Sequence, residues 1–125
     1  MADNTTTVAE LRRIVETFVA ERDWRQFHTP KNLAMSLAIE AAELMEHFQW
    51  LTADESRAIA EDAAKRSAAG EELADVICYA LAMANELGID VADSMLDKMR
   101  KNAIKYPASQ MRGRWGHDDP RSPGE

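Results

Sequence analysis

The segment that decides the fold is residues 30–50, which read PKNLAMSLAIEAAELMEHFQW. Its apolar residues recur at helical spacing, and its leucines lie on one stripe. Thr29 and Pro30 open the segment as an N-cap and a first helical residue, the position at which helices accept proline. We therefore expect one helix from Pro30 to about Trp50.

Helical periodicity continues on both sides of this segment. Thr7 and Thr52 each stand three residues before a glutamate, which is the pattern of a capping box, and each predicts a helix that begins at the next residue. The helix after Thr52 is expected to reach about residue 69, where Gly70 breaks or kinks it. The expected helices cover residues 8–21, 30–50, 53–69, 71–87 and 91–105.

The composition agrees with an all-helical chain. The chain has 125 residues, the size of one domain, and 46% hydrophobic residues supply one modest core. Aromatic residues make up only 6%, and alanine and methionine are frequent, which favours helices over strands. We expect an all-α bundle of four or five helices over residues 1–107 and a polar, flexible tail over residues 108–125. Because such a core is marginal, oligomerisation is expected to complete it.

The composition also excludes several classes of protein. With 22 acidic residues against 15 Lys+Arg, the net charge of −7 disfavours binding to a nucleic-acid polymer. No apolar run approaches the length that spans a bilayer, and the N-terminus lacks the pattern of a signal peptide, so we expect a cytoplasmic protein without a membrane partner. The lone Cys78 excludes an internal disulfide and a cysteine-built zinc site.

Charge is distributed unevenly along the chain. Residues 39–75 hold ten acidic and three basic residues, so this segment alone accounts for the net charge. Residues 98–114 hold six basic residues and no acidic residue. An acidic middle followed by a basic final helix is the pattern that a functional interpretation has to explain.

Four acidic residues in the middle segment share one geometric relationship. Glu40 and Glu43 lie one turn apart on the shoulder of a buried helix face, and Glu72 and Asp75 do the same on a later helix. If the two helices pack antiparallel, these carboxylates converge and attract a hard divalent cation such as Mg²⁺. Glutamate pairs at this spacing are also common on solvated helix surfaces, so a surface role stays open. A di-iron site needs a Glu-x-x-His motif on each of two helices, which this sequence lacks.

Other polar and aromatic residues have two possible interpretations. Lys98, Asn102 and Lys105 recur at helical spacing, and this basic face either binds phosphate or complements the helix dipole. Trp24, in a predicted loop, and Trp50, at a helix end, either stack on a nucleobase or serve the core.

The two histidines that precede residue 50 are candidates for a general base. His28 lies in a predicted loop and His47 at the edge of a helix, positions at which histidine is more often structural. The sequence contains no glycine-rich phosphate loop, nucleophile elbow or Cys/His cluster, so Walker-type and acyl-transfer chemistry have no support.

Together these residues resemble a known family. The spaced motifs Glu40-Ala-Ala-Glu43 and Glu72-Leu-Ala-Asp75 are similar to the ExxE…ExxD signature of the all-α, MazG-like nucleoside triphosphate pyrophosphohydrolases, and the closer likeness is to their dCTP pyrophosphatase branch. The likeness runs from about Leu11 to Pro107. Its further blocks are Phe18–His28, Pro30–Leu33, Phe48–Trp50 and Lys98–Pro107.

The resemblance implies roles for individual residues. It implies a Mg²⁺ site made by Glu40, Glu43, Glu72 and Asp75. It implies that a carboxylate of this set, Glu43 first and then Glu40, activates the attacking water. It also implies that Trp24 and Trp50 enclose the base, and that the residues near sugar or phosphates are Tyr79, Lys98, Asn102 and Lys105.

The resemblance further implies a reaction and an assembly. Such proteins convert an NTP or dNTP to the monophosphate and pyrophosphate, and they form homodimers or homotetramers. The expected substrate is dCTP or a modified pyrimidine nucleotide, although Val15 stands where some members have a histidine near the base. The alternative is a non-catalytic nucleotide-sensing or helical interaction module, in which the acidic residues lie on the surface.

Overall fold

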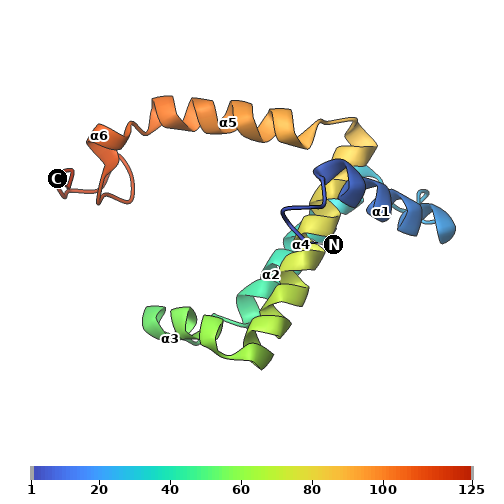
Figure 1. The fold of residues 1–125 in the computed structure, drawn as a ribbon, viewed down its shortest axis with the longest axis horizontal. Coiled ribbons are helices and arrows are strands. Elements are labelled where there is room, and N and C mark those ends of the chain that lie inside the picture. The colour runs from blue at the N-terminus through green and yellow to red at the C-terminus, as the bar shows by residue number, and fades with distance from the viewer. Residues whose placement is uncertain (1, 125) are drawn as a thin grey trace. The chain divides into compact units, whose positions relative to one another are not determined.

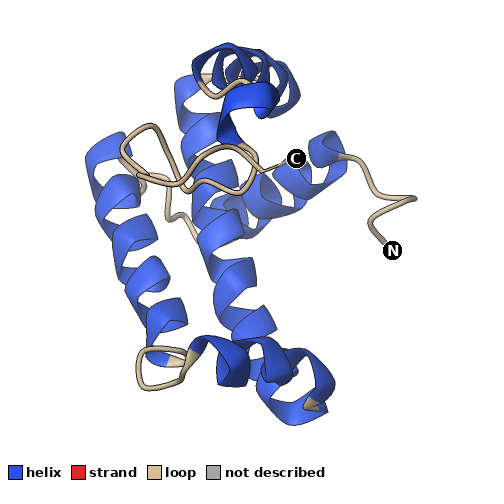
Figure 2. Ribbon diagram, turned by 90° about the vertical axis from the view of Figure 1, so that its left-hand side faces the viewer, coloured by secondary structure: helices blue, strands red, loops and turns tan. Residues whose placement is uncertain are grey.

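The computed structural model describes residues 2–124, which form helices and turns without a strand (Figures 1 and 2). The predicted all-α class is therefore confirmed. No helix in this range is long and apolar enough to cross a membrane. The elements are α1 (Val8–Glu21), α2 (Pro30–Glu46), α3 (Ala53–Ala58), the 3₁₀ turn η1 (Ile59–Glu61), α4 (Ala63–Leu87), α5 (Val91–Lys105) and α6 (Ala108–Met111).

Three of the predicted helix starts, at residues 8, 30 and 53, are confirmed by their caps. Thr7 and Thr52 each form a complete capping box, because the side chain accepts from the backbone N–H three residues on while the glutamate there accepts from the threonine N–H. Thr29 caps α2 and accepts from Asn32 N, with Pro30 at the first helical position. At the C-terminal end of α4, Gly88 takes the left-handed conformation (φ 63°) that ends the helix.

The end of α2 lies earlier than predicted, at Glu46 instead of Trp50. Residues 47–50 form turns in which the backbone tightens. His47 N donates to Leu44 O at 3.3 Å and Leu51 N donates to Phe48 O at 3.0 Å, which are bonds across three residues rather than four. The apolar stripe continues through this region, so hydrophobic spacing alone does not reveal that the helix has ended.

The predicted break at Gly70 is wrong. α4 runs without interruption from Ala63 to Leu87, and the chain bends instead at η1, just before Asp62. Asp62 caps α4 by accepting from Lys65 N at 3.0 Å, which sets the start of the helix. A single glycine costs a helix only about 1 kcal/mol relative to alanine. Packing against α2 along this long helix offsets that cost.

α4 is the centre of the first of two units, which ends at Ile89. Both α1 and α2 pack on α4, and Figure 1 shows α2 lying antiparallel beside it. The buried apolar side chains form a small core, and they are Val19, Leu33, Leu81, Ala82 and Ala84.

The second unit begins at Asp90 and contains α5, α6 and the loop that follows. In the segment expected to be a flexible tail, Asp119 is only 2% exposed. Its carboxylate accepts from Trp115 N at 2.8 Å and from Arg121 N at 3.0 Å, and it also pairs with the Arg121 guanidinium. This arrangement holds the pKa of the Asp119 carboxyl well below its usual range, chiefly through the side-chain bond with Arg121. The predicted boundary at residue 107 and the mobility of the tail stay predictions.

Candidate functional site

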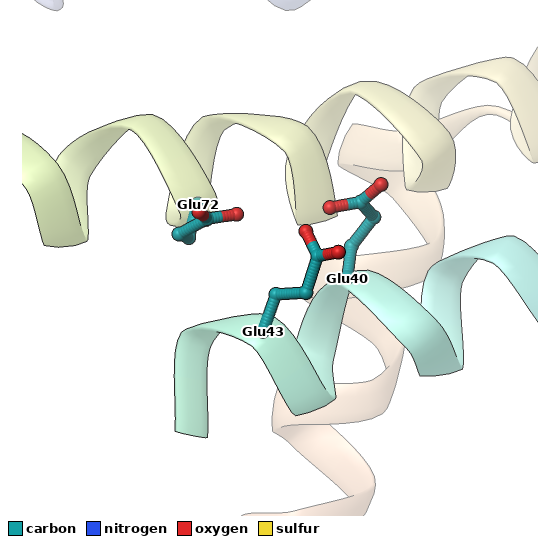
Figure 3. A group of neighbouring side chains, drawn as sticks. All are labelled: Glu40, Glu43 and Glu72. Carbon is teal, nitrogen blue, oxygen red and sulfur yellow. The ribbon is translucent and has the colours of Figure 1, made fainter. Parts of the chain in front are cut away.

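Three of the four predicted carboxylates meet between α2 and α4. Glu40 and Glu43 project from one face of α2, and Glu72 faces them from α4 (Figure 3). Each residue offers an oxygen atom that lies within 4.8 Å of the others. The helical spacing aligns the first two residues and the antiparallel packing brings in the third. We call this group the carboxylate cluster.

Glu40 is the member of the carboxylate cluster that has a buried oxygen atom unpaired among the described residues. Its Oε2 atom is buried and has no hydrogen-bond partner within residues 2–124. Burial, and after it the neighbouring Glu43, Asp75 and Glu72 carboxylates, together raise the pKa of Glu40 to about 7. Within the described chain, no lysine or arginine forms an ion pair with any member of the cluster.

The donor set fits a divalent cation. Converging carboxylate oxygens are the ligands that Mg²⁺ and Mn²⁺ prefer, and a cation would pair the orphaned Glu40 oxygen and relieve the mutual repulsion. Asp75, the fourth predicted ligand, is close enough for its charge to act on Glu40, but it lies outside the group of atoms within 4.8 Å. Its role as a ligand stays a prediction.

His47 is a contact of the cluster that the sequence did not assign. Its Nε2 atom lies 3.8 Å from Glu72 Oε1, and both side chains are about one-third exposed or less. His47 follows Glu43 by four residues and is the C-cap of α2, in helical conformation, so its side chain lies on the side of Glu43. This spacing is the signal in the sequence that places a histidine beside the acidic residues.

An aromatic cavity of about 340 Å³ adjoins the carboxylate cluster through Asp75, which lines its wall. The other walls come from α1, from the loop after it and from α4. Phe18, Trp24, His28 and Tyr79 form a continuous row of rings, with successive centroids 5.7, 6.3 and 6.4 Å apart. A cavity lined by aromatic rings can bind a planar ring by stacking. The adjoining carboxylates can bind a metal ion that holds an anionic group of the same ligand.

The structure brings together some of the predicted binding residues and not others. Trp24 and Tyr79 both line the aromatic cavity, and their roles in binding base and sugar stay predictions. Trp50 is 87% exposed and lies outside the cavity. The remaining candidates belong to α5 in the second unit, where their roles stay predictions, and they are Lys98, Asn102 and Lys105.

Sequence reasoning did not single out two other residues of the cavity wall. Phe18 packs edge-on against Trp24, and the wall also includes the Cys78 thiol. Helical spacing places Phe18 on the apolar face of α1. Periodicity identifies the face of a helix that turns inward, but it does not tell whether that face meets core or a cavity.

Comparison with known proteins gives consistent results. The profile of the MazG-like family matches residues 35–117. The chain is 40% identical over 107 residues to dCTP pyrophosphatase 1 of Bos taurus, a match covering 86% of this chain and 63% of the bovine protein. It is 42% identical over 102 residues to dCTP pyrophosphatase 1 of Homo sapiens, covering 82% of this chain and 60% of the human protein. The chain therefore spans less than two thirds of the length of these curated relatives.

A solved structure extends the similarity to the fold. The crystal structure of a pyrophosphatase from Archaeoglobus fulgidus DSM 4304 superposes with a TM-score of 0.75 at 38% sequence identity. This match covers 86% of the present chain and 98% of the archaeal chain. Nearly the whole archaeal chain therefore has a counterpart here.

Proposed function

The chain belongs to the MazG-like family, and from this premise we propose that it is a metal-dependent pyrophosphohydrolase that converts a nucleoside triphosphate to the monophosphate and pyrophosphate. The observation that carries the proposal is the carboxylate cluster beside the aromatic cavity. The cluster suits a metal-bound triphosphate, and the cavity suits a base. The relatives named dCTP pyrophosphatase 1 support dCTP or a modified pyrimidine deoxynucleotide as the substrate.

The proposal assigns the metal to the carboxylate cluster. Glu40, Glu43 and Glu72 would hold a divalent cation, Mg²⁺ by preference of the oxygen donors, together with Asp75. A bound divalent cation neutralises triphosphate charge and lowers the pKa of bound water. The orphaned Glu40 oxygen supports this assignment, since a buried carboxylate without a partner is costly to the fold.

Glu43 is the proposed catalytic base, with Glu40 as the second candidate. Glu43 is the exposed member of the cluster, so water reaches it, whereas Glu40 and Glu72 are half-buried. Its carboxylate would take the proton from the water that attacks the α-phosphorus. The bond from that phosphorus to the bridging oxygen then breaks, and pyrophosphate leaves with the electron pair.

The remaining residues would bind the substrate. Trp24 would stack on the base and Tyr79 would border the sugar, since both line the aromatic cavity. Lys98, Asn102 and Lys105 are proposed to bind the phosphates, on the strength of their helical spacing within a segment, residues 98–114, that has no acidic residue. Trp50 is proposed to cover the base from outside the cavity, since its exposed ring is accessible to a ligand.

We also propose that the active form is a homodimer or homotetramer. The chain buries few apolar side chains, while large ones are exposed on α5, including Met95 at 62% and Leu96 at 71%. Such surfaces are stable in water when a second copy covers them. Light scattering should give a mass of two or four chains.

We propose in addition that the protein acts in the cytoplasm, because the nucleotides that would be its substrates are found there.

The experiment that tests the proposed function is product analysis. Purified protein is incubated with Mg²⁺ and a panel of NTPs and dNTPs, with EDTA as the control. Monophosphate plus pyrophosphate, lost on chelation and strongest for a deoxycytidine nucleotide, is the expected result. Diphosphate plus phosphate contradicts the proposed reaction. Binding without turnover favours the nucleotide-sensing alternative.

A further inference from the structure

The turn that ends α1 contains a residue in the left-handed conformation. Asp23 has φ 51°, and among residues 2–124 it is the one residue other than glycine with a positive φ. Asp23 N donates to Ala20 O at 3.1 Å. Trp24 N donates to Val19 O, also at 3.1 Å. These two bonds are those of a Schellman turn, in which the residue at the position of Asp23 is left-handed.

The same turn ends α4, where the left-handed residue is a glycine. Gly88 has φ 63°, and the N–H of the next residue donates to Ala84 O at 2.9 Å, which is a bond of the same span. Glycine adopts this conformation without a steric cost, and asparagine and aspartate are the other residues that adopt it routinely. Asp23 therefore occupies a position that few residue types can fill.

The turn fixes the backbone of Trp24 on both sides. Its N–H is held by Val19 O, and its carbonyl accepts from Phe27 N at 2.9 Å and from His28 N at 3.1 Å. Val19 and Trp24 both line the aromatic cavity, so the turn that pairs their backbones also brings both side chains to the cavity wall. Rotation of φ at Asp23 into the usual negative range would break this pairing and turn the indole away from the cavity.

A second set of contacts supports the indole ring of Trp24. Phe18 packs against it edge-on, with ring centroids 5.7 Å apart and ring planes at 75°. Arg22 covers the Phe18 ring, with its guanidinium carbon 3.6 Å from the ring centroid, and its Nη1 donates to Phe18 O at 3.0 Å. Because Arg22 directly precedes Asp23, the turn that directs Trp24 also places this support.

The carboxylate of Asp23 takes little part in these contacts. It is exposed, and it accepts from Gln26 Nε2 at 3.3 Å, while the same nitrogen donates to the Asp23 carbonyl at the shorter distance of 3.0 Å. The described residues that line the aromatic cavity do not include Asp23 or Gln26. The contribution of Asp23 is therefore its backbone conformation rather than its charge.

We propose that Asp23 is a positioning residue for nucleotide binding, and that its left-handed backbone presents the Trp24 indole to the base in the aromatic cavity. The inference rests on the proposed function and deepens it, since it explains how the stacking ring is held in place before the ligand arrives. A ring that is already in position loses less entropy when the base binds, so the turn contributes to affinity. This contribution appears in KM, whereas kcat is set at the carboxylate cluster.

The test separates backbone conformation from charge by substituting Asp23 in two ways. Asp23→Gly and Asp23→Asn remove the charge and keep the left-handed conformation accessible, whereas the branched side chain of Asp23→Val disfavours it. Asp23→Val should raise KM for the preferred nucleotide by about 5- to 50-fold, because stacking on Trp24 is lost, while kcat changes by less than about 3-fold. Asp23→Gly and Asp23→Asn should keep KM within about 3-fold of the wild-type value.

A spectroscopic measurement follows Trp24 without turnover. The chain has three tryptophans, and the substitutions Trp50→Phe and Trp115→Phe leave Trp24 as the single one. In this background Asp23→Val should shift the emission to longer wavelength, because the indole leaves the cavity wall for water, and Asp23→Gly should not. Asp118→Val is the matched control, since it makes the same change at an exposed aspartate in a turn where φ is not positive. It should leave the emission, KM and kcat unchanged.

Three results overturn the inference. If Asp23→Gly and Asp23→Asn raise KM as much as Asp23→Val, the carboxylate is required and the backbone conformation is not the cause. If Asp23→Val leaves KM and the Trp24 emission unchanged, the conformation at this position does not place the indole. A fall in kcat that matches the rise in KM shows a general structural role.

The test does not depend on one variant or on turnover. Circular dichroism checks the helical fold, and Asp23→Ala takes the place of Asp23→Val if the latter does not fold. If the wild type hydrolyses no nucleotide, the proposed function fails separately. The emission of the Asp23 variants then decides whether this residue positions Trp24, and an emission that is the same in all of them overturns the inference.

Discussion

Arg12 and Asn85 exchange a reciprocal pair of hydrogen bonds that fastens α1 to α4. Arg12 Nε donates to Asn85 Oδ1 at 2.9 Å, and Asn85 Nδ2 donates to the Arg12 carbonyl at 3.0 Å. The same guanidinium donates from Nη1 to Ile89 O at 2.7 Å, just beyond the end of α4. Both α1 and α4 contribute residues to the wall of the aromatic cavity, and this pair joins the two helices.

Asn85→Ala should therefore loosen the cavity as well as the fold. The change leaves partly buried groups of Arg12 unpaired, so the free energy of unfolding should fall by about 1–3 kcal/mol. KM for the nucleotide should rise while kcat changes little. Urea unfolding and steady-state kinetics measure the two effects. Ser67→Ala, an exposed change on the same helix, should alter neither, and a similar loss in both variants contradicts the prediction.

Glu43→Gln should abolish turnover and leave the helices intact. The amide cannot accept the proton of the attacking water, so kcat should fall by about 10²- to 10⁴-fold. Product analysis and circular dichroism measure activity and fold. Glu46→Gln provides the control, since Glu46 is exposed on the same helix and lies outside the carboxylate cluster. Retained turnover in Glu43→Gln would remove this residue from the role of base.

Without metal, the protein should lose stability as the pH rises through the range from about 4.5 to about 7. Burial and the neighbouring carboxylates raise the pKa of Glu40 to about 7 in the folded chain, so the folded state holds a proton that the unfolded state has released. Unfolding midpoints in urea, taken at intervals over this range, should decrease. Glu40→Gln should flatten the profile, and an identical slope in that variant excludes Glu40 as its source.

Metal binding should release protons below pH 7, because the cation needs the ionised form of Glu40. Titration calorimetry in two buffers with different ionisation enthalpies measures the number released. Affinity for Mg²⁺ or Mn²⁺ should increase with pH through the same range. A binding enthalpy that does not depend on the buffer at pH 6 contradicts the assignment of Glu40 as a ligand.

His47→Leu should weaken metal binding by about 10- to 100-fold. His47 Nε2 lies 3.8 Å from Glu72 Oε1, so its removal frees that carboxylate to turn away from the carboxylate cluster. Titration with Mn²⁺, followed by electron paramagnetic resonance, measures the affinity. His47→Gln, which keeps a hydrogen-bond donor, should recover part of it. Equal affinity in all three proteins shows that Glu72 keeps its position without His47.

Local chemistry explains what the sequence predicted well. A threonine three residues before a glutamate satisfies the free N–H groups of a helix start, so the starts at Val8 and Ala53 need no knowledge of the fold. The pairing of Glu40 with Glu43 follows in the same way from the helical repeat. Both features depend on residues within four positions of one another.

The features that were missed depend on distant contacts or on competing weak preferences. Whether Gly70 ends a helix depends on how firmly the flanking turns pack against α2, which no local pattern contains. Phe18 and Tyr79 line the same aromatic cavity although they are far apart in the sequence. His47 and Glu72 are likewise distant in the sequence and come into contact only because α2 packs on α4. Periodicity gives the inward direction of such side chains, but it does not identify their partners.

The uninterrupted course of α4 limits how this protein can change its substrate. Glu72 of the carboxylate cluster and Tyr79 of the aromatic cavity lie seven residues apart on one helix. A rise of about 1.5 Å per residue therefore spaces their backbones by roughly 10 Å. An inserted residue between them would turn Tyr79 by about 100° away from the cavity. The metal-binding and base-binding ends thus have a fixed spacing on α4, and a new base preference has to arise from substitutions in the cavity wall rather than from residues inserted between Glu72 and Tyr79.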